Sequence, residues 1–185
     1  MKLISSFIIF KRRGVYIVKI AVISDTHDHK TNILRAVNVI NERKVDVLIH
    51  CGDYVSPFVT KWFDKLHDSI KKNFYGVFGN NDGEHVGLKV NLKGVCDIIG
   101  MEMNTEIFGK KIFTAHMPSL KTVEALAKSG EYDIILFGHT HNIFKKKYEN
   151  EVLALNPGEV CGYLTNKSTF AIIDTERMEA EIIEL

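Results

Sequence analysis

The sequence lacks the features that mark membrane, secreted or strongly polyionic proteins. Its formal net charge is only +1, so no large field attracts nucleic acid or a membrane surface. No apolar run approaches the about 18–20 residues that span a bilayer. Its three cysteines, at positions 51, 96 and 161, are odd in number and have no paired spacing, which is typical of a reducing compartment. We therefore expect a cytoplasmic protein with no membrane partner.

The composition that is present is that of an ordinary globular protein. Of its 185 residues, 45% are apolar and 25% are charged, which suits one hydrophobic core. We expect a single domain over 18–185. The segment 1–17 places its positive charge after a short apolar run, the reverse of a secretory signal. We interpret it as an N-terminal extension: an extra strand, an arm, or the product of a mis-set start codon before Val18.

The first half of the chain alternates apolar runs with amphipathic segments. The apolar, β-branched runs predict buried strands within 16–24, 45–53 and 73–82. Apolar residues at helical spacing predict helices over 31–43 and 56–68. Alternating strands and helices are typical of parallel βαβ units.

The second half is richer in strands. Residues 97–115 predict a two-stranded hairpin with Gly109 in its turn, and 119–130 predict a helix capped by Ser and Gly. A buried strand is predicted within 132–138, and further strands joined by turns within 143–185. We expect an α/β fold in which two sheets face each other and the helices lie outside.

Polar turns follow many of these buried strands. In α/β sheets, ligands gather outside the carboxyl ends of the strands. Residues two apart in an extended segment point the same way, so each D-x-H or H-x-H pair can aim two side chains into one cavity. We expect the following turns to converge on one rim: Asp25-Thr26-His27, Gly52-Asp53, Gly79-Asn80-Asn81-Asp82, Ala115-His116 and Gly138-His139-Thr140-His141.

The series DTH, GD, GNND, H and GHTH, in this order, resembles the calcineurin-like metallophosphoesterases. Within them it resembles the small YfcE-like phosphodiesterases of bacteria and archaea, over 18–185 and including the stretch NPGEVCGY. Each piece is weak alone, but the ordered set is specific. The resemblance implies a four-layer α/β/β/α sandwich of two facing mixed sheets. It also implies a metal-dependent phosphodiesterase that acts on small phosphodiesters.

The same resemblance implies two divalent metal ions per chain. The implied ligands are Asp25, His27 and His141 for the first metal, Asn80, His116 and His139 for the second, and Asp53 as the bridge. Mixed imidazole and oxygen ligands suit transition metals better than calcium or magnesium. We expect manganese, with nickel, cobalt, iron or zinc as alternatives. A metal-bound hydroxide would be the nucleophile, because metal binding lowers the pKa of water to about 7.

Two departures from the family pattern bear on activity. Many relatives have a His general acid where this chain has Asn81, which cannot deliver a proton at neutral pH. We assign Asp53, Asn80 and Asn81 as catalytic residues and expect good leaving groups to be preferred, because losing a general acid costs about 10²–10⁴ in rate. Met117 and Pro118 replace a Gly and a second His that relatives commonly have, which predicts altered specificity.

Other functions stay open on the sequence alone. A retromer subunit of eukaryotes resembles this family and serves as a scaffold, so a protein-binding module is one alternative, although the complete ligand set favours an enzyme. A nuclease is another, although no basic, aromatic-studded groove for long nucleic acid is evident. A Cys51 thiolate could act as a nucleophile in principle. A homo-oligomer is equally open.

The remaining histidines are expected to lie outside the metal ligands. We interpret His50 as a core residue or an outer partner of the site, and His67 as solvated. His29 and His85 lie near the predicted rim, and we interpret both as residues without a metal.

Overall fold

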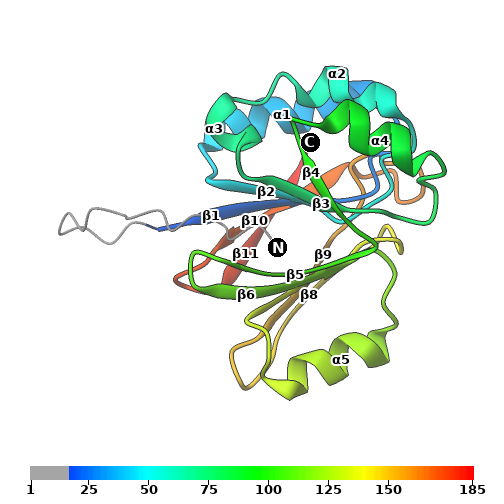
Figure 1. Cartoon of the computed structure of the whole chain (residues 1–185). Coiled ribbons are helices and arrows are strands. Elements are labelled where there is room, and N and C mark those ends of the chain that lie inside the picture. The colour runs from blue at the N-terminus through cyan, green and yellow to red at the C-terminus, as the bar shows by residue number, and fades with distance from the viewer. Residues whose placement is uncertain (1–16) are drawn as a thin grey trace.

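Two mixed β-sheets form the centre of the computed structural model, which describes residues 17–185 (Figure 1). The strands of the first sheet are β1 (Lys19–Ile23), β2 (Val47–His50), β3 (Phe74–Val77), β4 (Asp97–Gly100), β10 (Thr169–Asp174) and β11 (Glu179–Glu184). They lie in the order β11-β10-β1-β2-β3-β4. Strands β1 to β4 run parallel, whereas β10 and β11 are antiparallel to their neighbours.

The second sheet faces the first across the middle of the molecule (Figure 1). Its strands are β5 (Glu102–Ile107), β6 (Lys110–Ala115), β7 (Ile134–Leu136), β8 (Ile143–Lys147) and β9 (Leu153–Pro157). They lie in the order β5-β6-β7-β9-β8. Strands β6, β7 and β9 run parallel, and β5 and β8 are antiparallel edge strands.

Helices cover the outer face of each sheet (Figure 1). They are α1 (Lys30–Arg43), the 3₁₀ turn η1 (Pro57–Val59), α2 (Thr60–Phe63), α3 (Asp68–Lys71), α4 (His85–Leu92) and α5 (Leu120–Ser129). Helices α1 to α4 lie over the first sheet, and α5 lies over the second. This arrangement confirms the predicted four-layer α/β/β/α sandwich.

Each pair of neighbouring layers encloses its own hydrophobic cluster. In β1, Ala21 and Ile23 join the cluster under the helices, whereas Ile20 and Val22 join the cluster between the sheets. Successive side chains of a strand point to opposite faces, so a strand buried on both faces reads as a continuous apolar run. A third cluster, which includes Val123, lies between α5 and the second sheet. Burial on both faces therefore explains why the strand sequences show little alternation.

Two helices match their predictions closely. Helix α1 begins one residue before the predicted segment and ends with it, with Ile33, Val37 and Ile40 buried. Helix α5 begins after Ser119, whose hydroxyl accepts a hydrogen bond from the Thr122 amide at 3.1 Å. It ends at a glycine with a positive φ, as the sequence predicts.

The predicted helix over 56–68 is wrong in its continuity, because the segment divides into η1, α2 and α3. His67 is extended, with φ −60° and ψ 144°, and interrupts the helix. The side chain of Asn41 in α1 satisfies the backbone at this break: it donates to the Lys65 carbonyl at 3.0 Å and accepts from the His67 amide at 2.9 Å. Ser56 precedes η1, but its side chain makes no capping hydrogen bond.

The prediction of two strands over 97–115 is also wrong, because three strands occupy this region. Ile98 of β4 packs in the cluster under the helices, whereas Met103 of β5 packs between the sheets. The chain therefore crosses from the first sheet to the second at Met101. The hairpin of β5 and β6 is present, with Gly109 in its turn at φ 77°.

Helix α4 has no counterpart among the predicted elements. It buries Leu88 and Leu92, and the Glu84 carboxylate accepts a hydrogen bond from the Gly87 amide at its start. No helix within residues 17–185 is both long enough and apolar enough to cross a membrane. The predicted extension over 1–17 lies outside the described residues, except for Ile17.

Candidate metal centre

The polar turns converge at one edge of the paired sheets. Strands β1, β2, β3, β6 and β7 end just before the predicted ligands. The backbone itself joins the first two turns, since the Asp25 amide donates to the Gly52 carbonyl at 3.1 Å and the Thr26 amide donates to the Asp53 carbonyl at 3.0 Å. The parallel arrangement of these strands therefore places their carboxyl ends together.

Asp25 forms the centre of the first half of the site. Its carboxylate is fully buried. The Oδ1 atom lies 3.3 Å from Nε2 of His141 and 3.8 Å from Nε2 of His27. His27 Nε2 also lies 3.4 Å from Oδ2 of Asp53. The ligand atoms of Asp25, Asp53, His27 and His141 are therefore close together.

Asp53 links this half to the second half. Its Oδ2 atom lies 3.2 Å from Nε2 of His116. The His116 and His139 rings lie 5.4 Å apart, and His139 Nδ1 lies 2.8 Å from Oδ1 of Asn80. The structure thus brings together all the residues that the sequence predicts as metal ligands. Asp25 Oδ1 also lies 3.9 Å from Nε2 of His116, so both carboxylates lie next to this histidine.

Asn81 contacts the site through Asp53. Its backbone amide donates to Asp53 Oδ1 and its side-chain amide donates to Asp53 Oδ2, both at 2.8 Å. Burial alone would raise the pKa of Asp53, but the His116 imidazole beside it and the hydrogen bonds from Asn81 hold that pKa well below its usual range. The side chain of Asn81 is exposed, so it can also reach a bound substrate.

The carboxylates of Asp25 and Asp53 also change the pKa values of the neighbouring histidines. Burial lowers the pKa of His116, but the carboxylates of Asp53 and Asp25 raise it above its ordinary value. Asp25 raises the pKa of His27 in the same way, with a further contribution from Asp53. The carboxylates of Asp25 and Asp53 therefore favour positive charge beside them.

Local backbone geometry at the site is unusual. Several of the predicted ligands have positive φ values: Asp25 at 52°, His27 at 40°, Asp53 at 62°, His139 at 69° and His141 at 59°. Residues other than glycine rarely adopt this left-handed region of backbone conformation. Glycines let the turns approach closely, because a Cβ atom at Gly79 would lie 2.1 Å from Oδ1 of Asp53.

The donor atoms of the site fit a bound metal. The buried side-chain atoms that lack a hydrogen-bond partner within residues 17–185 include Asp25 Oδ1, His27 Nε2 and His116 Nε2. Burying polar atoms without partners costs free energy. A divalent cation coordinated by these atoms removes that cost, and carboxylate and imidazole are ligands that transition metals prefer.

Two outer residues hold the ligand turns in place. The Asp82 carboxylate is buried and accepts from the amides of Asp53 at 3.0 Å and Gly79 at 2.7 Å. His50 contacts Thr26 Oγ1 at 3.0 Å and accepts from the Gly52 amide at 3.0 Å. Burial lowers the pKa of His50. The interpretation of His50 as an outer partner agrees with these contacts.

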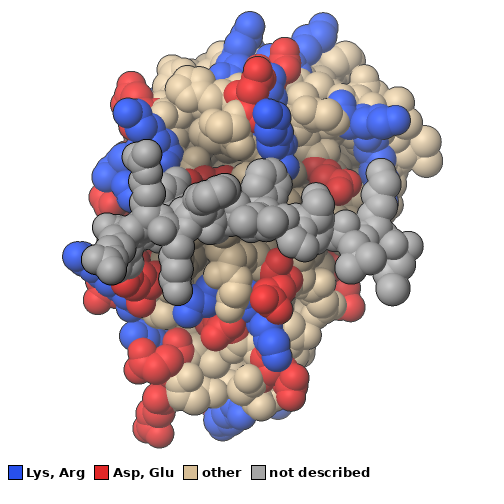
Figure 2. All heavy atoms as spheres, turned by 60° about the vertical axis from the view of Figure 1, so that its left-hand side comes forward, with Lys and Arg blue, Asp and Glu red and all other residues tan. Residues whose placement is uncertain are grey.

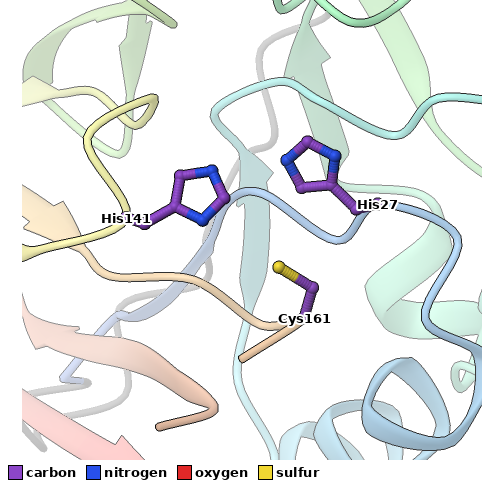
Figure 3. Close-up of side chains that lie close together, drawn as sticks. All are labelled: His27, His141 and Cys161. Carbon is purple, nitrogen blue, oxygen red and sulfur yellow. The ribbon is translucent and has the colours of Figure 1, made fainter. Parts of the chain in front are cut away.

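Glu159 and Cys161 are functional candidates that sequence reasoning missed. Donor atoms of His27, His141 and Cys161 all lie within 4.8 Å of one another. Figure 3 shows the Cys161 sulfur pointing toward the space beside the His27 and His141 rings, and the three residues come from three separate segments. Glu159 Oε2 lies 2.6 Å from Nδ1 of His141. The motif NPGEVCGY was the available signal, but its spacing does not reveal which side chains point inward.

Cys51 does not act as the nucleophile considered above. Its thiol is fully buried in the cluster between the sheets, and burial raises its pKa well above the ordinary value. The carbonyl of Cys51 instead lies 2.8 Å from His116 Nδ1 and fixes that ring. Cys51 therefore supports a ligand through its backbone.

The two rim histidines contact other groups. His29 Nδ1 accepts from the Asn32 amide at 3.2 Å and caps α1. The His85 ring stacks on Phe78 with ring centroids 3.9 Å apart. Neither belongs to the groups of His, Cys, Asp and Glu side chains in residues 17–185 that could hold a metal.

The face drawn in Figure 2 carries charged side chains of both signs. Lys and Arg side chains are interspersed there with Asp and Glu. This mixture agrees with the formal net charge of +1. Because it holds buried ligand atoms without partners, the cluster at the sheet edge is the candidate functional centre of the described residues.

Two facing mixed sheets with helices outside and a carboxylate–imidazole cluster at their edge define the class of the metallophosphoesterases. The sequence model of the calcineurin-like phosphoesterase superfamily domain matches residues 18–178. The chain belongs to the calcineurin-like phosphoesterase superfamily. This result confirms the resemblance that the ordered motifs indicated.

Two related archaeal sequences support the assignment to this superfamily. The chain is 43% identical over 171 residues to a phosphodiesterase of Methanocaldococcus jannaschii, covering 91% of this chain and 99% of the relative. It is 32% identical over 168 residues to a probable metallophosphoesterase of Methanothermobacter thermautotrophicus, covering 89% and 91%. Both matches extend over nearly the whole of each chain.

Solved structures agree with the sequence comparisons. The structure of an archaeal phosphodiesterase matches with a TM-score of 0.83 and 41% identity, covering 91% of this chain and all of that one. YfcE of E. coli, a phosphoesterase, matches with a TM-score of 0.59 and 16% identity, covering 90% and 98%. The second likeness concerns the fold alone.

Proposed function

We propose that the protein is a metal-dependent phosphodiesterase that hydrolyses small phosphodiesters with two divalent cations. The observation that carries this proposal is the set of buried, unpartnered ligand atoms of Asp25, His27 and His116 at the edge of the sheets. A relative with 43% identity bears the name phosphodiesterase, which supports the same reaction.

Each ligand has a defined place in the proposed centre. Asp25, His27 and His141 would hold one cation, Asn80, His116 and His139 would hold the other, and Asp53 would bridge them. When bound, the cations supply Lewis-acid activation of water and of the phosphoryl group. The chain keeps these ligands in place with rigid outer contacts, such as that between Asp82 and the Asp53 amide at 3.0 Å.

Manganese is the cation we propose first, with nickel, cobalt, iron or zinc as alternatives. Imidazole nitrogen and carboxylate oxygen ligands can bind all of these metals. The presence of the Cys161 thiol beside His27 and His141 adds a softer atom near the first position. Thiolate ligands favour zinc over manganese, so metal analysis of this chain bears directly on the role of Cys161.

Substrate selection is proposed to favour good leaving groups. Asn81 can donate a hydrogen bond to a phosphoryl oxygen, but it cannot protonate a departing alkoxide. A pocket of about 330 Å³ adjoins the second half of the site, and its lining includes Asn80, His116, Met117 and Pro118. Met117 and Pro118 belong to this lining, which supports the proposal that they alter substrate specificity.

The direct test pairs metal analysis with hydrolysis of bis-p-nitrophenyl phosphate. The purified protein should bind close to two manganese ions per chain and should hydrolyse the diester only when manganese is present. Asp53→Ala should lose both properties, while Glu124→Gln, at an exposed ion pair with Lys128, should keep both. Tight metal binding without hydrolysis of any phosphoester would overturn the proposal and favour a scaffold.

A further inference from the structure

Glu159 is a buried carboxylate that receives an unusual number of hydrogen bonds. Its side chain is fully buried. Oε2 lies 2.6 Å from Nδ1 of His141 and accepts from Cys161 Sγ at 2.9 Å and the Tyr163 amide at 2.9 Å. Oε1 accepts from the Leu164 amide at 2.9 Å and from the amide and hydroxyl of Thr165 at 2.6 and 2.8 Å. Its contacts therefore divide between a predicted ligand and the loop that follows.

The contact with His141 decides which ring nitrogen faces the site. A carboxylate that occupies Nδ1 requires a hydrogen on that atom, which leaves the Nε2 lone pair free to coordinate. Nε2 of His141 lies 3.3 Å from Asp25 Oδ1, on the side of the proposed first cation. Outer carboxylates that hold a metal-binding histidine in this way orient the ring and increase its basicity.

The contacts with the loop place an aromatic ring beside the same half of the site. The backbone amides of residues 163–165 donate hydrogen bonds to the Glu159 carboxylate. The Tyr163 ring lies 5.3 Å from the His29 ring and 6.4 Å from the His27 ring, and its side chain is exposed. One carboxylate thus fixes both a ligand and the rim above it.

We infer that Glu159 is a positioning residue that sets the tautomer and orientation of His141 and joins the rim segment 163–165 to the first cation position. This inference rests on the proposed metal centre. Glu159 contacts Nδ1 of His141, on the opposite side of the ring from Nε2, and therefore acts through that ring. The effect of its removal should therefore appear first in metal affinity.

The test measures manganese binding by calorimetry on the full chain after metal removal. Glu159→Gln offers one acceptor oxygen in place of two, and its amide group opposes the donors around it. We expect it to weaken one of the two binding steps by about 10–100-fold, the usual effect of losing an outer partner. Glu159→Asp, which keeps the charge, should recover part of this loss.

Thr165→Val is the matched control for the loop. It removes the hydroxyl contact with Glu159 and leaves the His141 contact intact, so manganese affinity should stay within about threefold of the wild type, well below the loss expected for an outer partner of a ligand. If Thr165→Val weakens binding as much as Glu159→Gln, loop order and not His141 positioning is responsible. Equal affinities of Glu159→Gln and the wild type would also overturn the inference.

A second measurement needs no folded Glu159 variant. Nitrogen NMR of the histidine rings in the metal-free wild type, with His141→Ala to assign the signals, should show hydrogen on Nδ1 of His141. Hydrogen on Nε2 alone would contradict the inference. A wild type that binds no manganese would overturn the proposed function itself, whereas normal wild-type binding with an unaffected Glu159→Gln would overturn only the role of Glu159.

Discussion

Asp25 Oδ1 lies 3.3 Å from Nε2 of His141, although Asp25 follows β1 of the first sheet and His141 follows β7 of the second. The candidate site is therefore assembled across the two sheets. Neither sheet alone supplies the full set of ligands. Substitutions at single ligands should consequently separate the two halves of the centre.

His141→Ala should remove one of the two cations and leave the other. Its ring lies next to Asp25, in the proposed first cation position, whereas His116 and His139 belong to the proposed second position. Metal content per chain, measured by mass spectrometry after dialysis, should fall from about two to about one, as expected when one position of a two-metal site is lost. His67→Ala, at an exposed position before α3, is the control and should keep both metals. Retention of two metals by His141→Ala would exclude it as a ligand.

Asn81→His should reduce the preference for good leaving groups. A histidine at this exposed position can protonate a departing alkoxide, and a general acid contributes about 10²–10⁴ in rate. The gain should be large for a dialkyl phosphate and small for bis-p-nitrophenyl phosphate, whose leaving group needs little protonation. The ratio of kcat/KM for the two substrates measures the effect. An unchanged ratio in a variant that binds metal normally would show that leaving-group protonation does not limit the reaction.

Metal removal should destabilise the protein. The buried atoms without partners at Asp25, His27 and His116 lose their proposed ligand when a chelator is added. A cation present at 100 times its Kd contributes about 2.7 kcal/mol to the free energy of unfolding. For a chain of this size, that corresponds to about 5–10 °C in Tm.

Thermal unfolding with and without chelator measures this difference. Manganese should restore the Tm of the wild type and should have a much smaller effect on Asp53→Ala, which lacks the bridging carboxylate. The same Tm shift in both proteins would mean that manganese stabilises the fold from another position.

Two glycines of the same turn provide a matched pair. A Cβ atom at Gly79 would lie 2.1 Å from Asp53 Oδ1 and 2.4 Å from the Asp53 amide nitrogen, whereas one at Gly83 would meet no atom within 4 Å. Gly79→Ala should therefore displace Asp53 and reduce both metal content and hydrolysis to near background. Gly83→Ala should resemble the wild type in both measurements. Similar behaviour of the two variants would show that the close approach at Gly79 is not needed.

Much of the fold could be predicted because its strands are buried on both faces and its longer helices are amphipathic. The region 56–71 was harder, because the tertiary contact of Asn41 with the backbone at Lys65 and His67 satisfies a break that local pattern does not show. The crossing at Met101 was also hidden. Only Met101 separates β4 from β5, and the side chains of these two strands pack in different clusters.

The candidate ligands could be predicted because they follow strand ends in an ordered series. Glu159 could not, since its role depends on the loop 163–165 folding back onto a carboxylate and on His141 lying beside it. Asp82 was visible in the GNND turn, but its contact with the Asp53 amide depends on the pairing of neighbouring strand ends. The spacing of residues in a single sequence does not identify residues, such as Glu159 and Asp82, that support the ligands indirectly.

The positive φ values of Asp25, His27, Asp53, His139 and His141 have a consequence for how this chain can diverge. Each non-glycine residue in that region carries a conformational cost of about 1–3 kcal/mol. A duplicated copy freed from selection for metal binding would gain stability by exchanging these side chains for glycine. Metal binding and backbone stability therefore make opposite demands on these five positions.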